Sequence, residues 1–231
     1  MPTKSRNRQA QWRSDSGYSK SAETRKAILR AAIEAFGKTG YGATTTRQIA
    51  AAAGVNQPAI NYYFGGKDGL YKACADEILA NFVGPLGEVA QQALAATEAG
   101  LDRKGAARQL QELLSALADV MIRSEEVSEA AGFVGREMRE PGLAYQALYQ
   151  NLWAPGIELA ARLIATVKGR PDTDAADRVD AIMMISGIAA FVPGQSVSMR
   201  IMGWQEAGIE GKALVLTRLS AQIDGWMHSP K

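Results

Sequence analysis

The sequence predicts an all-α protein, with a small helix-turn-helix domain near its N-terminus and a larger helical domain after it. Apolar residues recur every three or four positions along most of the chain, which is the spacing of one helix face. No stretch alternates apolar and polar residues between hairpin turn signals, so strands are not expected. With 231 residues, 47% of them hydrophobic, the chain is long enough to bury the core of one or two domains.

The segment from Thr44 to Phe64 predicts two short helices joined by a tight turn. A threonine opens the first helix as its cap, Gly54 offers a left-handed stop, and Asn56 caps the second helix. Pro58 is compatible with the second helix because it falls in the first turn, where its missing N–H has no partner. A helix this short can lie in a DNA major groove. The outward residues of this helix would be Gln57, Ala59, Asn61 and Tyr62.

Charge is unevenly placed along the chain. Residues 1–72 hold 12 Lys/Arg and 4 Asp/Glu, whereas residues 73–231 hold 14 and 20, so the two parts carry +8 and −6. A basic module on an acidic body is the pattern expected when one module binds phosphate. Residues 1–20 have no apolar period, so we expect a disordered basic arm. This arm would either add phosphate contacts to DNA or be a dispensable leader.

Several classes of function are not indicated by the sequence. The single cysteine, Cys74, excludes an internal disulfide and suits a reducing compartment. No spacing of potential ligands fits a metal site, and the single histidine, His228, is poorly placed for a catalytic base. We therefore expect neither an enzyme nor a bound metal or cofactor. No N-terminal apolar signal and no unbroken apolar run of membrane-spanning length occurs, so no membrane partner is expected.

Glycine and proline signals divide the remaining helices. The first helix is expected to begin at Ser21 or Thr24 and to end with Gly40 as its left-handed residue. A helix opening at Lys67 should break at Gly84–Pro85. Further helices are predicted at 86–98, 105–123, 125–139, 142–168, 174–192 and 208–228. The expected organisation is an arm at 1–20, a helix-turn-helix domain at 21–66 and a larger helical domain at 67–231.

The N-terminal motifs follow a recognisable order. They are Gly40-Tyr41, Thr45-Thr46-x-x-Ile49-Ala50, Ala53-Gly54-Val55 and Ile60-x-Tyr62-Tyr63-Phe64-x-x-Lys67, followed by Leu70. This order closely resembles the TetR family of bacterial transcriptional regulators over residues 24 to about 74. Further along, Arg136-Glu137-Met138-x-x-Pro141, followed by Tyr145, Leu148, Tyr149 and Pro155, resembles the C-terminal domain of the CecR-like subgroup.

The resemblance implies DNA contacts for ten residues. Contacts to the DNA backbone would come from Thr45, Thr46, Tyr62, Tyr63 and Lys67. Base edges would be met by Arg47, which suits guanine, by Gln57, which suits adenine, and by Pro58 and Ala59, which suit a thymine methyl group. Asn61 departs from the aromatic residue usual in the family, so it would either read a base or bind a phosphate. Tyr63 is as consistent with packing beneath its helix as with a DNA contact.

The resemblance also implies a homodimer. The helices near 142–168 and 174–192 have wide apolar faces, and such a pair in TetR relatives meets its twin as a four-helix bundle. The two-fold axis would then place two recognition helices about 34–36 Å apart on a palindromic operator. From the sequence alone, these faces are equally consistent with an intramolecular core.

The other helices of the larger domain would enclose a pocket for a small apolar effector with a polar group. The residues proposed to contact the effector are Met121, Arg123, Phe133, Arg136, Glu137, Tyr145, Tyr149, Trp153 and Met184. Core packing is the alternative for each residue taken singly. The leading interpretation is a homodimeric repressor that a small molecule releases from its operator, acting in the bacterial cytoplasm and on the nucleoid while DNA-bound. A non-specific architectural DNA-binding protein fits the acidic body poorly.

Overall fold

The structure is a computed structural model that describes residues 6–123, 125–192, 197–205 and 207–228. The described residues form helices and connecting loops without strands, which confirms the all-α fold. The elements are α1 (Arg6–Ala43), α2 (Thr46–Ala52), α3 (Gln57–Phe64), α4 (Lys67–Glu98), α5 (Arg103–Arg123), α6 (Glu125–Arg139), α7 (Tyr145–Leu148), the π-helix η1 (Tyr149–Trp153), α8 (Ala154–Val167), α9 (Ala175–Ala189), α10 (Val197–Met202) and α11 (Gly208–His228). No described helix is long and apolar enough to cross a membrane.

The helices pack into two compact units. Unit 1 comprises Met1–Glu77 and Gly132–Ala144, and unit 2 comprises Ile78–Ala131 and Tyr145–Lys231. Two helices, α4 and α6, therefore contribute residues to both units. The boundary expected between residues 66 and 67 falls inside unit 1, because the start of α4 and the second half of α6 pack with α1. Helical periodicity shows which face of a helix is buried, but not which partner buries each half.

Unit 1 has an apolar core at the centre of its helices. The fully buried side chains include Ile28 and Phe36 of α1, Ile49 of α2, Ile60 of α3 and Leu70 of α4. Four aromatic rings meet beside this core: Phe36 and Tyr71 are 4.7 Å apart, Tyr41 and Tyr71 are 5.1 Å apart, and Tyr71 and Phe133 are 4.7 Å apart. Such aromatic pairs add to the stability that their buried area provides.

Helix α1 begins earlier than the sequence predicted. Its backbone is helical from Arg6, inside the stretch expected to be disordered, whereas residues 1–5 lie outside the described range. The hydroxyl of Thr24 donates to the carbonyl of Lys20 at 2.8 Å, which is the bond of an interior helical threonine rather than of a cap. Arginine and glutamine make up five of residues 6–13, and their helix propensity favours the extension of α1. Gly40 adopts the predicted left-handed backbone, with φ of 80°.

The predicted break at Gly84–Pro85 is wrong, because α4 continues through Pro85 to Glu98. A proline inside a helix leaves one carbonyl in the preceding turn without its N–H partner. Pro85 and its neighbours Val83 and Gly84 are exposed, so water can reach this turn of the helix. Buried Phe82 before the proline and buried Ala93 after it anchor both parts of α4.

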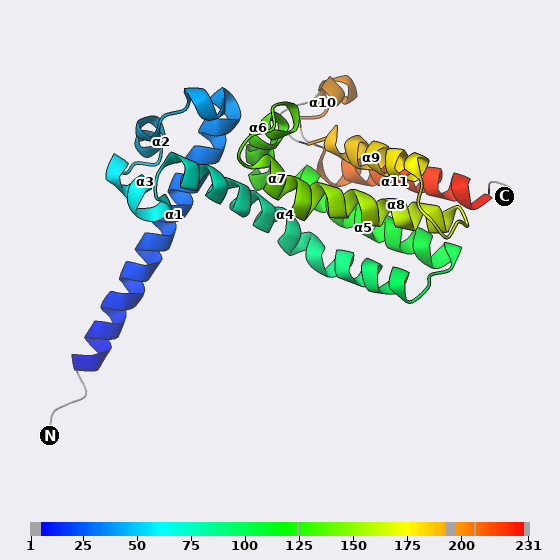
Figure 1. Ribbon diagram of the computed structural model, residues 1–231, viewed down its shortest axis with the longest axis horizontal. Coiled ribbons are helices and arrows are strands. Elements are labelled where there is room, and N and C mark those ends of the chain that lie inside the picture. The colour runs from blue at the N-terminus through cyan, green and yellow to red at the C-terminus, as the bar shows by residue number, and fades with distance from the viewer. Residues whose placement is uncertain (1–5, 124, 193–196, 206, 229–231) are drawn as a thin grey trace. The chain divides into compact units, whose positions relative to one another are not determined.

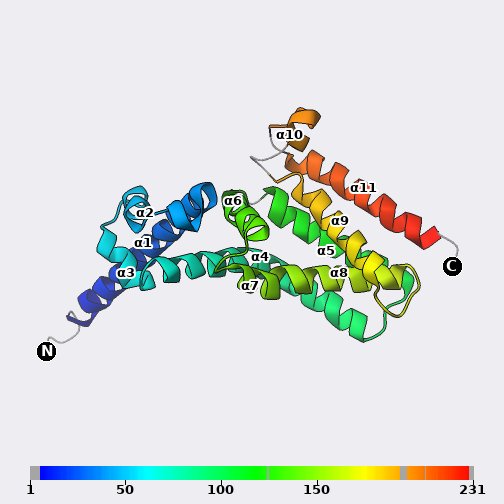
Figure 2. The same cartoon turned by 45° about the horizontal axis from the view of Figure 1, so that its top comes forward.

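Unit 2 is a helical bundle in which α5, α8, α9 and α11 lie side by side (Figures 1 and 2). Helix α8 is the most enclosed, since seven of its side chains are buried. The core brings together Leu110 and Leu114 of α5, Leu163 and Ile164 of α8, Met184 and Ile188 of α9, and Ile223 of α11.

The helix expected over residues 142–168 is divided into α7, η1 and α8. In η1 the Ala154 N–H donates to the Tyr149 carbonyl five residues earlier, which is the wider turn of a π-helix. Pro155 follows directly, in the first turn of α8, and has no N–H to continue an α-helical ladder back into this turn. The proline thus accounts for a local change of helix type that apolar spacing does not show.

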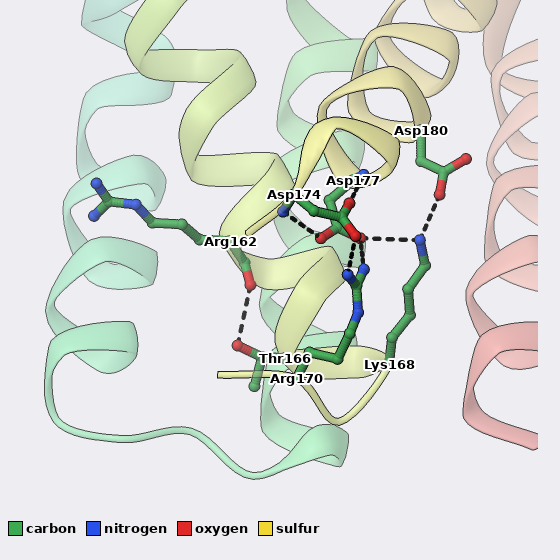
Figure 3. A network of polar contacts seen from close by, with 7 residues as sticks. All are labelled: Arg162, Thr166, Lys168, Arg170, Asp174, Asp177 and Asp180. Carbon is green, nitrogen blue, oxygen red and sulfur yellow. Dashed lines mark hydrogen bonds and ion pairs between the residues drawn. The ribbon is translucent and has the colours of Figure 1, made fainter. Parts of the chain in front are cut away.

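A network of ion pairs and hydrogen bonds stabilises the turn between α8 and α9 (Figure 3). Asp177 is fully buried, and its carboxylate accepts from the Lys168 ammonium at 3.0 Å and from the Arg170 guanidinium. Lys168 also reaches Asp180 at 2.6 Å, and Arg170 also pairs with Asp174. Burial lowers the pKa of Lys168, but its bonds to the two aspartates outweigh that effect and raise it overall. The buried carboxylate is therefore compensated by two cations.

Arg103 connects three helices at the same end of the bundle. From the start of α5, its guanidinium donates to the Val167 carbonyl of α8 at 2.7 Å. It also donates to the carbonyls of Trp226 and Met227 of α11 at 2.9 and 3.2 Å. These carbonyls belong to helix C-termini that lack intrahelical partners, so one side chain caps two helices.

Candidate nucleic-acid interface

The two short helices of the predicted helix-turn-helix, α2 and α3, are capped as their sequence requires. The Thr45 hydroxyl accepts from the Gln48 backbone N–H at 3.2 Å, while the Gln48 side chain accepts from the Thr45 N–H at 2.8 Å. These reciprocal bonds form a capping box at the start of α2. Gly54 has φ of 67°, which confirms the left-handed turn expected there.

Helix α3 has caps at both ends. The Asn56 side chain accepts from the Ala59 N–H at 3.2 Å, and Pro58 lies in the first turn. Gly65 ends the helix in the left-handed conformation, with φ of 71°. Ile60 is fully buried beneath the helix, whereas the side chain of Tyr62 is 83% exposed. The helix is thus anchored on one side and open on the other.

The ten residues predicted to contact DNA differ in their exposure to solvent. The exposed side chains are those of Thr45, Arg47, Gln57, Pro58, Asn61 and Tyr62. Thr46, Ala59, Tyr63 and Lys67 are partly buried. The Gln57 amide lies 3.3 Å from the Thr46 hydroxyl, which joins the outer surface of α3 to the start of α2. The exposed set occupies the first turn of α2 and the outer face of α3.

Tyr63 and Lys67 both have partners within unit 1. The Tyr63 hydroxyl lies 3.1 Å from the hydroxyl of Ser21 on α1. The Lys67 ammonium lies 4.3 Å above the ring of Tyr41, which is a cation–π distance. Asp68 accepts a hydrogen bond from the Tyr41 hydroxyl, and this bond raises the pKa of the tyrosine. Lys67 therefore has a defined position at the N-terminus of α4, beside α3.

Thr44 is a structural residue of the motif that the sequence did not single out. It is 2% exposed, and its hydroxyl donates to the Gly40 carbonyl at 2.7 Å. The same hydroxyl lies 2.8 Å from that of Thr39. Thr44 thus joins the end of α1 to the start of α2. Its position directly before the capping residue Thr45 is the sequence feature that could have indicated this structural role.

The second half of α6 packs closely on α1 at a pair of glycines. A Cβ at Gly37 would lie 2.9 Å from the backbone nitrogen of Phe133 and 3.2 Å from the carbonyl carbon of Gly132. One turn later, Arg136 donates to the carbonyls of Gly37 and Lys38 at 3.0 and 2.7 Å. Arg136 therefore caps the main helical part of α1, immediately before Gly40.

Glu137 forms the second polar contact of this helix half. It is 2% exposed and accepts from the Tyr71 hydroxyl at 2.6 Å and from the Gly142 N–H at 3.1 Å. Burial, and then the bond to Glu137, raise the pKa of Tyr71 above its usual range. Phe133, Arg136 and Glu137 were expected to contact an effector, but the structure places them against α1 and α4 of unit 1.

The remaining predicted effector residues lie in unit 2. Tyr145 stacks on Tyr149 at 5.9 Å and meets Trp153 at 5.7 Å, so α7 and η1 carry an aromatic cluster. Met184 is 1% exposed in the core, and Met121 packs against that core from α5. The side chain of Arg123 lies outside the described residues. The structure brings the three aromatic residues together but does not join them to the other predicted contacts.

Unit 2 contains a cavity at a different place, between α5 and α11. Its volume is about 260 Å³. The lining residues are Gln111, Leu114, Ser115, Leu216, Leu219, Ser220 and Ile223. None of the nine predicted effector contacts is among them.

Comparison with known proteins identifies both parts of the chain. Residues 28–74 match the family of bacterial regulatory proteins named after tetR. Residues 106–224, more than half of the chain, match the C-terminal domain of the HTH-type transcriptional dual regulator CecR. The chain belongs to the TetR family of transcriptional regulators.

Individual relatives of this TetR-family chain agree with that assignment. It is 31% identical to the HTH-type transcriptional dual regulator CecR of Shigella flexneri over 211 residues, which cover 89% of this chain and 92% of that protein. A TetR-like regulator from Rhodococcus sp. RHA1 has the same fold, with a TM-score of 0.59, 22% identity and coverage of 89% of this chain and 97% of that one. A complex of SmeT with triclosan also shares the fold, with a TM-score of 0.54 and 17% identity over 84% of this chain and 90% of that one.

Membership of this family makes the protein a DNA-binding transcriptional regulator rather than an enzyme. The exposed residues of α2 and α3 are therefore the candidate interface with DNA.

Proposed function

We propose that the protein is a homodimeric repressor that binds a palindromic operator and leaves it when a small molecule occupies unit 2. The observation that carries this proposal is the form of α3, which is capped at both ends, buried at Ile60 and exposed at Tyr62. A rigid short helix with one open face can enter the major groove and read base edges. Such a repressor acts in the bacterial cytoplasm, on the nucleoid while it is DNA-bound.

The proposed dimer interface uses the exposed apolar face of α9. Val179, Ile182 and Met183 are 52%, 46% and 61% exposed, and their spacing places them on one side of the helix. The large apolar residues of α8 are buried within unit 2, so α8 has little apolar surface left for a second copy. Helix α11 offers more, since Leu214 is 47% exposed near a row of small residues at Ala213, Thr217 and Ala221. We therefore assign α9 and α11 as the pair that meets its twin.

Release by an effector requires that the ligand bind two conformations with different affinities. One conformation holds the two recognition helices at operator spacing, and the other does not. Helices α4 and α6 belong to both units, so they are the elements through which a change in unit 2 would reach unit 1. The triclosan complex of SmeT is an example of a similar fold with a small molecule bound. The related CecR is a dual regulator, so activation at some promoters is the alternative mode of control.

The test is a gel-shift titration on an inverted repeat from the DNA that flanks the gene. Tyr62→Ala should weaken operator binding about tenfold or more through loss of an exposed contact to the DNA backbone. Lys67→Ala should weaken binding about equally across sequences and reduce the salt dependence of affinity by roughly one phosphate contact. Lys104→Ala removes an exposed lysine of α5 and serves as the matched control.

Sedimentation of the same proteins separates DNA contacts from assembly. Tyr62→Ala and Lys67→Ala should remain dimers, whereas Met183→Glu should give monomers and lose operator binding together. Wild-type operator affinity in both Tyr62→Ala and Lys67→Ala would contradict the assignment of the interface. A monomeric wild-type protein would contradict the proposed repressor.

A further inference from the structure

The cavity between α5 and α11 lies between two fixed points. The helices run antiparallel, and at one end the Lys212 ammonium of α11 pairs with Asp119 of α5 at 2.6 Å. At the other end Arg103 of α5 donates to the last carbonyls of α11, those of Trp226 and Met227. Between these contacts, the cavity residues Gln111 and Ser115 face Leu216, Leu219 and Ser220. The two helices are therefore joined by polar contacts beyond both ends of the cavity.

The cavity is lined by uncharged side chains. Leu114 and Ile223, which are 2% and 0% exposed, connect it to the core of unit 2. Leu216 and Leu219 add apolar wall from α11. An ion placed here would meet no opposite charge on the lining. The lining therefore favours a neutral ligand with an apolar body.

Three polar side chains of the lining have hydrogen-bonding capacity to offer. Within the part of the chain that the structure describes, the side chains of Gln111, Ser115 and Ser220 make no hydrogen bond. Three threonine hydroxyls on α4, α8 and α11 behave differently. Those of Thr97, Thr166 and Thr217 each donate to the carbonyl four residues earlier. The cavity thus presents polar groups from both helices that can bond a ligand.

We propose that this cavity is the effector site and that it takes a small uncharged molecule with an apolar ring or chain and hydrogen-bonding groups at two edges. This inference rests on the proposed effector-controlled repressor. Its volume of about 260 Å³ lies just below the ~300–1,000 Å³ of sites for drug-sized ligands, so the molecule is small. The apolar part packs on Leu114 and Ile223, and the polar edges bond Ser115, Ser220 or Gln111.

The position of the site links it to the proposed dimer. Two of the four α11 residues that line the cavity, Leu216 and Ser220, are each followed directly by an exposed residue, Thr217 and Ala221. A ligand between α5 and α11 therefore contacts the inner side of a helix whose outer side meets the second copy. A small shift of α11 changes the dimer face and, through the two-fold axis, the separation of the recognition helices.

The test uses two probes of equal size that differ in charge. 4-Hydroxybenzamide is neutral, and 4-hydroxybenzoate carries a carboxylate at neutral pH. Methyl NMR of the full-length protein should show saturable shifts of Leu114, Leu216, Leu219 and Ile223 with the amide, and no such shifts with the acid. Ser220→Leu, and separately Ser115→Leu from the opposite wall, should raise the Kd of the amide at least tenfold. Arg162→Leu, at an exposed position of α8, is the control and should leave the Kd unchanged.

Each outcome bears on the proposal. Shifts at the four lining residues that both serine variants weaken would support it. No shifts at those residues, equal shifts with the anion, or binding that survives both variants would overturn it. The wild-type gel shift in the same buffer keeps the two proposals separate. Operator binding without probe binding would refute only this site, whereas absence of operator binding would refute the proposed repressor.

Discussion

Replacement of Gly69 by alanine should displace the recognition helix. Gly69 is the third residue of α4, and a Cβ there would lie 1.8 Å from the carbonyl oxygen of Phe64, the last residue of α3. Real Cβ atoms essentially never approach another atom closer than 3.0 Å, so the two helices must separate by about 1.2 Å. The neighbour is backbone, which cannot rotate away as a side chain can.

The magnitude follows from this geometry. Overpacking of a core typically lowers the free energy of unfolding by about 1–3 kcal/mol. Replacement of glycine by alanine inside a helix raises it by about 1 kcal/mol. A net loss of roughly 0–2 kcal/mol in the free energy of unfolding is therefore expected. DNA affinity should suffer more, because hydrogen bonds of about 2.7–3.2 Å do not survive a displacement of this size. We expect an operator affinity at least tenfold lower, which corresponds to about 1.4 kcal/mol.

The assay combines operator titration with thermal unfolding followed by circular dichroism. Gly87→Ala is the matched control in the same helix, since a Cβ at Gly87 meets nothing within 4 Å. This control should be stabilised by up to about 1 kcal/mol and should bind the operator as the wild type does. If Gly69→Ala binds the operator with wild-type affinity and unfolds at the wild-type temperature, then the close contact of α3 with α4 does not hold the recognition helix.

Three further predictions concern the polar contacts. In a double-mutant cycle, Tyr71→Phe and Glu137→Gln should show a coupling of about 1.5–3 kcal/mol, read from amide hydrogen exchange of residues 132–139; additive effects would contradict it. The pKa of Tyr71 in the folded state is raised above the ordinary 10.0. The stability that the protonated Tyr71 hydroxyl contributes is therefore complete below this ordinary pKa and is lost as the pH rises through the folded-state pKa. Tyr71→Phe should accordingly remove the last-titrating part of the phenolate absorbance, whereas an unchanged titration curve would show that another tyrosine ionises last. Arg103→Ala should lower the stability of unit 2 by about 1.5–3 kcal/mol in urea unfolding followed by tryptophan fluorescence, and a loss below 0.5 kcal/mol would mean that water replaces these caps.

The helix-turn-helix was predictable because the contacts that determine its structure are local. The cap at Thr45 involves Gln48, the cap at Asn56 involves Ala59, and Gly54 supplies its own backbone freedom. Each of these contacts spans three residues or fewer. The buried and exposed sides of α3 follow equally from helical spacing, since Ile60 and Tyr62 lie on different faces.

Contacts that link distant parts of the chain were not predictable in the same way. Arg136 bonds carbonyls 99 and 98 residues earlier, and Glu137 bonds Tyr71, 66 residues away. Their sequence neighbourhood shows a basic and an acidic residue near aromatic ones, which equally suits a ligand pocket. Nothing local distinguishes a helix that closes a pocket from one that is built into the DNA-binding unit.

The sequence around the cavity residues indicates a ligand-facing surface only weakly. Gln111 and Ser115 are four residues apart on a helix face that also carries Leu114. Polar residues at helical spacing beside an apolar stripe indicate a wet or ligand-facing surface. Ser220 joins them only through the antiparallel pairing of α5 with α11, which the sequence does not show.

The π-helical turn of η1 has a consequence for comparing this chain with its relatives. A π turn holds one residue more than the α turn it replaces, and Pro155 fixes where that residue is accommodated. A homologue one residue shorter between Leu148 and Pro155 would run from α7 into α8 as regular α-helix, with its downstream side chains still in register. Alignment gaps of a single position therefore belong in this turn, and loss of one residue here is an evolutionary step that the buried face of α8 can tolerate.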